Sequence, residues 1–153
     1  MSHEIIEASG LRTSDAYRLM TDLVAPRPIA WVGTVDEAGR ANLAPFSYFQ
    51  AVCSRPPTIT LSVSWRPDGT PKDTLRNILE VGTFTVSHVS RPLAAAMNQT
   101  SAALPAGESE WDFAGVDAQA STRVAAPWVA GARAAFECAL KHAVPLGLSL
   151  IHI

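Results

Sequence analysis

The sequence carries little charge and no excess of either sign. Only 17% of its 153 residues are charged, and the formal net charge is −2. Binding to nucleic acid depends on clustered Lys and Arg side chains, which this chain lacks, so we expect no nucleic-acid partner. No apolar run is long enough to span a membrane or to form a signal peptide. We therefore expect a cytoplasmic protein that does not contact the membrane.

Cysteine and histidine are scarce too, and neither is arranged for metal binding. The two cysteines, Cys53 and Cys138, show no CxxC and no other metal-ligand spacing, and the four histidines are scattered. The chain also lacks the G-x-S-x-G, G-x-G-x-x-G and P-loop motifs. We expect no metal site, and the missing motifs favour chemistry that is carried out by a bound cofactor.

The hydrophobic pattern predicts a single domain over residues 1–153 that is mainly β, with peripheral helices. Short turns join most of the predicted strands, which favours an antiparallel sheet closed into a barrel over a parallel, doubly wound sheet. The predicted strands are 29–35, 41–52 with an interruption near Pro45, 58–64, 83–89 and 133–144. The predicted helices are 14–24 with Ser14 or Asp15 as cap, a short one that begins at Asp73, and one opened by Ser90; 99–115 is predicted as a loop.

The start of the second predicted helix combines features that suit a phosphate group. Asp73 is a good N-cap, Lys72 and Thr74 flank it, and Gly82 ends the apolar pattern. Free N–H groups, an ammonium and a hydroxyl together favour phosphate, while the negative charge of Asp73 makes it the helix cap and not a ligand. An ordinary capped surface helix explains the same residues.

The C-terminal end is apolar from residue 146 to residue 153 and has no polar tail. We interpret this as a barrel that is truncated at the C-terminus, with its natural last strands missing. Missing strands would leave a sheet edge or a face of the core uncovered.

Several segments, in order along the chain, together form a specific pattern, although each is weak alone. They are 26–32 (PRPIAWV), 42–49 (NLAPFSYF), 55–57 (RPP), 72–74 (KDT) with Asn77, 97–98 (MN), 109–110 (SE) with Gly115, and 137–138 (EC). This pattern resembles the flavin reductase-like family, whose members have an FMN-binding split-barrel fold. The resemblance covers about residues 12–145 of the sequence.

The resemblance implies a homodimer that binds FMN, reduces it with NADH or NADPH, and passes electrons to free flavin or to a partner such as a monooxygenase. It implies no catalytic side chain, because the flavin ring carries the redox chemistry. Matching positions imply that Asn42, Pro45, Phe46, Ser47 and Tyr48 line the flavin, largely through backbone groups. They also imply that Ser62 and Ser64 approach the ribityl chain and phosphate, and that Lys72, Asp73 and Thr74 form the phosphate end.

Other interpretations of these residues stay open. The chain could be a non-catalytic FMN-binding module, or a split barrel for another ligand such as pyridoxal phosphate or haem, with His88 as the axial ligand. Pro45 also suits an ordinary edge strand, and Ser62 and Ser64 suit a solvated strand face. Arg27 could pair with a phosphate, or with a carboxylate at the surface.

Overall fold

The computed structural model describes residues 3, 5–105, 108–147 and 149–152. Gly107 of the predicted loop, and Leu148 and Ile153 of the apolar C-terminal run, lie outside these residues. The elements in chain order are η1 (Ala8–Gly10), α1 (Thr13–Leu23), β1 (Ala30–Val35), β2 (Ala41–Phe46), β3 (Phe49–Ser54), β4 (Pro57–Ser64), α2 (Asp73–Val81), β5 (Thr83–His88), η2 (Arg91–Leu93), α3 (Ala94–Gln99), α4 (Glu110–Phe113), β6 (Ala118–Gln119), β7 (Trp128–Val129), β8 (Ala135–Ala139), β9 (Ala143–Leu146) and β10 (Ser149–His152).

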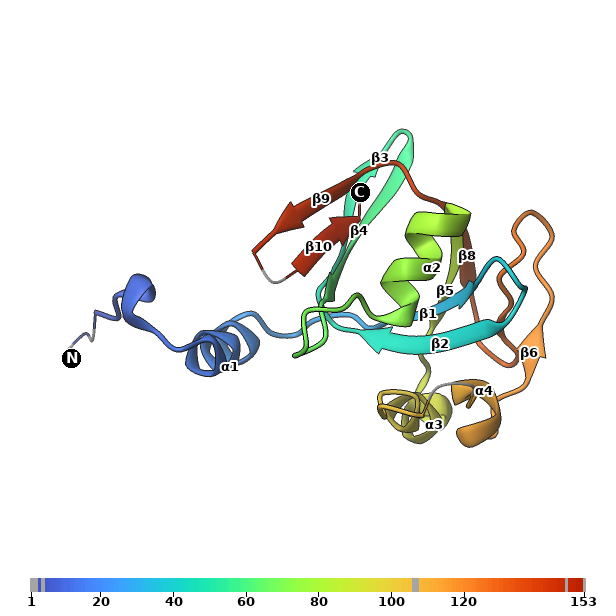
Figure 1. Ribbon diagram of the computed structural model, residues 1–153, viewed down its shortest axis with the longest axis horizontal. Helices are drawn as coiled ribbons and strands as arrows, with labels where there is room; N and C mark the ends of the chain where they lie inside the picture. The colour runs from blue at the N-terminus through green and yellow to red at the C-terminus, as the bar shows by residue number, and fades with distance from the viewer. Residues whose placement is uncertain (1–2, 4, 106–107, 148, 153) are drawn as a thin grey trace.

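The first sheet has the strand order β2-β1-β5-β8, and its described strand pairs are all antiparallel (Figure 1). The central strand β1 is buried along its whole length. Because successive side chains of a strand point to opposite faces, β1 contributes to two separate cores. Ala30 and Val32 pack in one cluster, and Trp31 packs in the other with Leu43, Trp111 and Val129.

The second sheet has the strand order β3-β4-β10-β9 and is also antiparallel. Leu61 and Val63 of β4 enter the same cluster as Val32 and Val86 of the first sheet, so the two sheets share a core. Within the described residues a short pair, β6-β7, completes the β structure. The predicted class, mainly β with peripheral helices in an antiparallel split barrel, is confirmed.

Helix α2 lies between the two sheets and packs against β1 and β2 (Figure 1). Its Leu75 and Ile78 are fully buried in the shared core, as the apolar spacing predicts. Gly82 takes the left-handed conformation, with φ of 76°, and its N–H donates to the Ile78 carbonyl at 3.0 Å. The predicted glycine end of this helix is therefore confirmed.

Helix α1 forms where the sequence predicts a helix, but the predicted cap is wrong. The N-cap position is Arg12, which makes no side-chain capping bond, and Asp15 instead pairs with Arg12 at 2.8 Å. No residue of α1 is buried. Figure 1 shows α1 set apart from the sheets on an N-terminal arm.

Two predicted strand boundaries are corrected by the pairing. Strand β2 runs through Pro45, which pairs with Trp31, and the break falls after Phe46. Proline fits there because β2 is the edge of its sheet, where an N–H is not needed for a second ladder. The strand predicted over 133–144 is two strands, β8 and β9, which lie in different sheets. The predicted loop 99–115 contains the short helix α4.

No cluster of three or more His, Cys, Asp or Glu side chains suited to a metal ion occurs among the described residues. Both cysteines are free thiols, and burial raises the pKa of Cys138 to about 12, so this thiol stays protonated and packs beside the core. Over the part of the chain that the structure describes, no helix is long and apolar enough to cross a membrane.

Candidate functional site

A pocket lies beside one end of the first sheet, where β1 begins and where β2 and β5 end. Strand β1 begins at Ala30, β2 ends at Phe46 and β5 ends at His88. The register pairs Ala30 with Phe46 on one side and with His88 on the other, so the three residues form a row. Ser47 and Tyr48 follow Phe46 directly, so the segment that is predicted to line the flavin lies at this end of the sheet.

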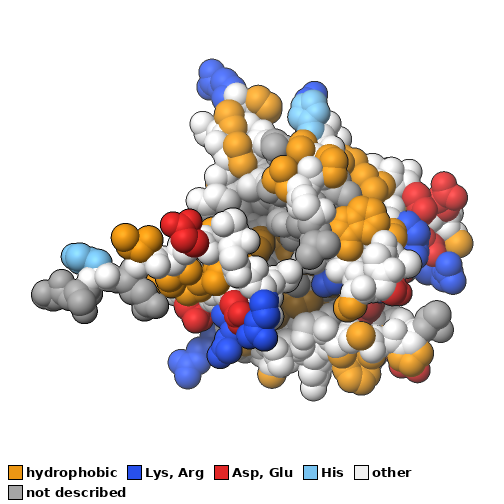
Figure 2. Space-filling model, turned by 60° about the vertical axis from the view of Figure 1, so that its left-hand side comes forward, with side chains coloured by type: hydrophobic (Ala, Val, Ile, Leu, Met, Phe, Trp, Pro, Cys, Tyr) orange, Lys and Arg blue, Asp and Glu red, His pale blue; other side chains and the backbone are white. Residues whose placement is uncertain are grey.

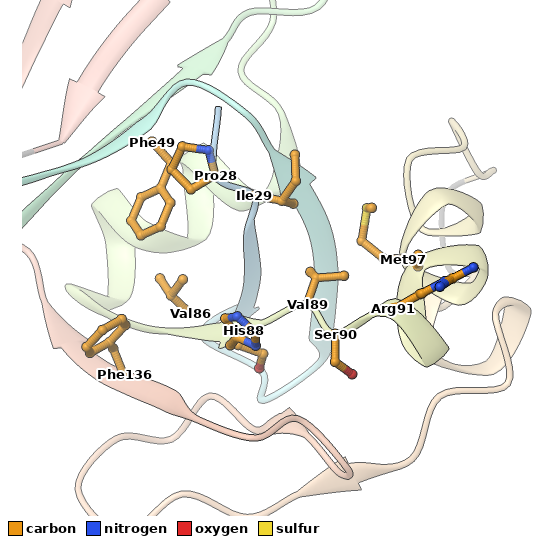
Figure 3. Close-up of a pocket in the computed structure, with 12 residues that line it drawn as sticks. Pro28, Ile29, Phe49, Val86, His88, Val89, Ser90, Arg91, Met97 and Phe136 are labelled. Atoms are coloured by element: carbon orange, nitrogen blue, oxygen red, sulfur yellow. The ribbon is translucent and has the colours of Figure 1, made fainter. Parts of the chain in front are cut away.

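The pocket has a volume of about 420 Å³ and mainly apolar walls. Figure 3 shows Phe49, Val86 and Phe136 on one side, and Ile29, Val89 and Met97 on the other. The polar residues of its lining include His88, Ser90 and Arg91. Apolar walls with a few polar groups are typical of pockets for aromatic ligands and cofactors, and the volume falls in their usual range.

Arg27 joins the N-terminal arm to the segment that follows β2. Its guanidinium donates at 2.5 Å to the carbonyls of Thr21 and Val24, so it satisfies the carboxyl end of α1. The same guanidinium lies 3.5 Å from the Ser47 hydroxyl and 5.9 Å from the centroid of the Tyr48 ring. Arg27 therefore positions the arm beside the pocket edge, and no carboxylate partner is recorded for it among the described residues.

The start of α2 differs from the sequence prediction. The N-cap is Lys72, which makes no side-chain capping bond, and Asp73 is the first helical residue. The Asp73 carboxylate lies 2.5 Å from Arg66 and 2.6 Å from Arg76, and Arg66 also donates to the Pro71 carbonyl. The prediction that Asp73 caps the helix is thus wrong, because two guanidinium groups hold its carboxylate. A negative charge in the first turn is still favourable to the helix dipole.

Lys72 has a different environment from the two arginines. Its ammonium lies 5.7 Å from the centroid of the Phe46 ring, and no carboxylate within salt-bridge distance is recorded for it in the described residues. Partial burial, and then the charge of Arg66, lower the pKa of Lys72 below its ordinary value. Because both effects disfavour the ammonium, an anion bound beside Lys72 would relieve them.

Asn42 and Thr74 face each other inside the protein. The Asn42 side-chain amide donates to the Thr74 hydroxyl at 2.9 Å, and both residues are buried. This bond joins the edge strand β2 to the first turn of α2. Asn42 also lines a second, polar cleft of about 930 Å³, together with Arg66, Asp73 and other residues.

Ser62 and Ser64 lie at the end of β4, on the strand that leads into the loop before α2. The Ser62 N–H donates to the Tyr48 carbonyl at 2.9 Å, which ties this strand to the segment after β2. Ser62 is half-buried, whereas Ser64 is exposed and pairs with Ser149 of β10. Ser62 therefore lies beside the segment after β2, and Ser64 directly precedes the loop that carries Arg66.

Comparison with known proteins decides the family of this chain. The family model of the flavin reductase like domain matches residues 23–153. The chain belongs to this family. A protein of Halalkalibacterium halodurans is 41% identical over 142 residues, which are 93% of this chain and 68% of that protein.

Solved structures of related flavin reductase-like proteins agree. Nitrilotriacetate monooxygenase component B from Bacillus cereus has a TM-score of 0.94 and 35% identity, over 99% of this chain and 78% of that one. A split-barrel protein from Shewanella frigidimarina has a TM-score of 0.83 over 94% of this chain and 71% of that one. At 24% identity, this second likeness concerns the fold alone.

The flavin reductase-like chain brings its ten predicted site residues into two groups. Pro45, Phe46, Ser47 and Tyr48 lie at and just after the end of β2, directly before Phe49 of the pocket lining, and the Lys72 ammonium lies near the Phe46 ring. None of these five residues belongs to the pocket lining itself. The Asp73 carboxylate pairs with the arginines, and the Thr74 hydroxyl accepts a bond from Asn42 in the protein interior. Asn42 also lines the polar cleft. Ser62 and Ser64 connect the two groups along β4. That these ten residues bind a flavin stays a prediction, and the structure shows only how they are grouped.

Sequence reasoning gave no role to Glu110, although it belongs to one of the resembling segments. Glu110 begins α4, is half-buried, and accepts a bond from the Leu43 N–H at 3.4 Å on the free edge of β2. Burial raises the pKa of its carboxyl above the ordinary value, and the charge of Asp73 adds to this effect. Sequence reasoning gave His88 only the alternative role of a haem ligand and gave Val89 and Met97 no role in a pocket, because the pairing of β1 with β5 cannot be read from local patterns.

Proposed function

We propose that this chain is a flavin reductase-type oxidoreductase that uses FMN, with NADH or NADPH as electron donor. The observation that carries the proposal is Lys72, a cation without a recorded carboxylate partner in the described residues, whose ammonium lies near the Phe46 ring. Phe46 is two strands away from His88, which lines the apolar pocket. An apolar pocket suits a flavin ring, and an unpaired cation at a helix N-terminus suits its phosphate. The membership in the flavin reductase like domain family supports this assignment.

The spacing of the two parts suits one elongated ligand. Phe46, beneath Lys72, and His88, in the pocket lining, lie on strands separated by β1. Two strand spacings correspond to about 10 Å, so a ring in the pocket and a phosphate near Lys72 are compatible with a single mononucleotide. Pro45, Phe46, Ser47 and Tyr48 would line the flavin between the pocket and Lys72, Ser62 and Ser64 would approach the ribityl chain, and Lys72 would bind the phosphate.

The side chains of the pocket have a limited chemical task. A bound flavin supplies the electron-accepting ring, so the protein must orient this ring and exclude water from one face. Phe49, Val86 and Met97 offer apolar surface for that purpose. The Arg66–Asp73–Arg76 cluster keeps α2 and its preceding loop in place beside the phosphate end.

We further propose that the chain acts as a homodimer and passes electrons to free flavin or to a partner protein. Exposed apolar side chains on or beside α1, including Tyr17, Met20 and Leu23, are not buried by the rest of the chain. Figure 2 shows hydrophobic side chains on this projecting arm. The ring centroids of Tyr17 and Tyr48 are 6.3 Å apart, so this surface is continuous with the segment after β2 and fits a second copy that covers both. The likeness to a monooxygenase component B supports a partner monooxygenase as acceptor.

Reconstitution tests the cofactor and the activity together. Purified protein is mixed with FMN, desalted, and its visible spectrum is recorded; steady-state oxidation of NADH and of NADPH is then measured with and without added FMN. We expect about one retained flavin per chain and nicotinamide oxidation that depends on flavin. Folded protein that retains no flavin and gains no activity from it would contradict the proposal, and pyridoxal phosphate would be tested next.

A further inference from the structure

Four buried polar side chains form a ladder between α2 and the first sheet. Thr34 of β1 and Asn42 of β2 are paired directly across the two strands, while Thr74 and Asn77 lie one helical turn apart on α2. Asn42 donates to Thr74 at 2.9 Å, and Asn77 donates to Thr34 at 3.1 Å. The exposed fraction is 0% for Thr34, 9% for Asn42 and 2% for both helix residues.

The polar ladder lowers the stability of the fold relative to apolar side chains at the same positions. The Asn77 Oδ1 atom is buried and has no hydrogen-bond partner among the described residues. An unsatisfied buried acceptor is destabilising, so apolar side chains at these positions would pack with less penalty. Apolar packing alone, however, is not directional, and would let a helix shift on the sheet. Directional bonds at two successive levels fix the helix at one height and one rotation.

The first turn of α2, which these bonds hold on the sheet, lies next to the phosphate end of the proposed site. Thr74 is two residues after Lys72, whose ammonium lies 5.7 Å from the centroid of the Phe46 ring. The other neighbours of Lys72 cannot do this alone, because Arg66 repels the ammonium and lowers its pKa. The hydroxyl of Thr74 is itself buried and engaged with Asn42, and not presented to the surface.

We propose that Asn42 and Thr74 are positioning residues that hold Lys72 in register, and thereby make the site prefer flavins with a phosphate over flavins without one. They act through the first turn of α2, and not by contact with the flavin. This inference rests on the proposed function, since it requires that Lys72 binds the phosphate of FMN.

The test compares FMN with riboflavin, which carries the same ring without the phosphate. Affinities for both are measured by fluorescence titration for wild type, Thr74→Val, Thr74→Ser and the matched control Thr85→Val. Thr85 is also a buried threonine of this fold, but its hydroxyl donates to the Pro127 carbonyl at 2.6 Å, away from α2. Thermal unfolding without ligand reports any general loss of stability.

We expect Thr74→Val to weaken FMN binding about tenfold and riboflavin binding less than about twofold, because only the phosphate contact is displaced. Thr74→Ser keeps the hydroxyl and is expected to retain the wild-type preference. Thr85→Val should lower the unfolding temperature without changing the preference. In the Lys72→Met background, Thr74→Val should cost no further FMN affinity, since a residue that acts through Lys72 has nothing left to position.

Three outcomes would overturn the inference. These are equal weakening of FMN and riboflavin by Thr74→Val, an unchanged preference, and additive losses with Lys72→Met, which would mean that Thr74 contacts the ligand itself. Failure of the proposed function has a different signature. Wild-type protein that binds FMN no better than riboflavin would remove the phosphate site, and with it this inference, before any variant is compared.

Discussion

Replacing Lys72 with methionine removes the cation at the phosphate end and keeps the length of its apolar stem. A hydrogen bond between charged groups contributes about 1.5–3 kcal/mol. Lys72 is exposed over much of its surface, so solvent screening favours the lower end of that range. We therefore expect Lys72→Met to weaken FMN binding about tenfold, with little change for riboflavin. Lys141→Met is the matched control, because Lys141 is an exposed lysine outside both clefts.

Fluorescence titration at two salt concentrations measures this effect. The wild-type affinity for FMN should fall as salt rises, and the Lys72→Met affinity should depend less on salt, because one charge no longer takes part. The FMN preference should also decline as the pH rises toward the pKa of Lys72, which burial and Arg66 lower from the ordinary value of 10.5. Equal losses for FMN and riboflavin, or identical behaviour of the two lysine variants, would refute the reasoning.

Three further predictions concern stability and assembly. Leu75 is fully buried, so Leu75→Ala should lower the free energy of unfolding by about 2–5 kcal/mol in denaturant titrations, whereas Leu79→Ala, at a residue 46% exposed, should cost far less. Burial raises the pKa of Glu110 in the folded chain above the ordinary value of 4.5, so the free energy of unfolding falls as the pH rises from 4.5 to the raised pKa. Glu110→Gln should therefore unfold at a higher temperature than wild type at neutral pH, and at the same temperature as wild type below pH 4.5. Leu23 is 79% exposed on α1, so Leu23→Glu should shift light-scattering mass from dimer to monomer without lowering the unfolding temperature of the chain; an unchanged dimer would place the interface elsewhere.

The fold was predictable where one short segment determines its own structure. The alternation around β4 and β5, the apolar face of α2 and the end at Gly82 depend on neighbours within a few residues. The resemblance over most of the chain then supplied the split barrel, which local patterns alone leave as one of several antiparallel barrels.

The predictions failed where the partners of a residue, and not the hydrophobic pattern, determine the local structure. The sequence suggests Asp73 as a cap, but Arg66 and Arg76 offer its carboxylate two ion pairs, and these replace the capping bond. Pro45 was expected to interrupt its strand, but β2 is a sheet edge, and that property depends on the order of all four strands. The engagement of Thr74 by Asn42 likewise depends on how α2 crosses β2.

The candidate pocket shows the same division. Residues 45–48, which are predicted to line the flavin, form a continuous motif, whereas His88 and Met97 enter the pocket lining through the pairing of β5 with β1 and through the turn that follows. A sequence pattern can identify segments that approach a ligand. The pairing register determines which of their side chains share one cavity.

Anaerobic mixing of the FMN-loaded protein with excess NADH, or with NADPH in a parallel trace, tests the central claim most directly. The account predicts that the visible flavin absorbance bleaches in a single rapid phase with at least one of the two donors, and that bleaching is much faster than for the same concentration of free FMN. Protein that retains FMN but bleaches no faster than free FMN would contradict the account, and would identify the chain as a flavin-binding module without reductase activity.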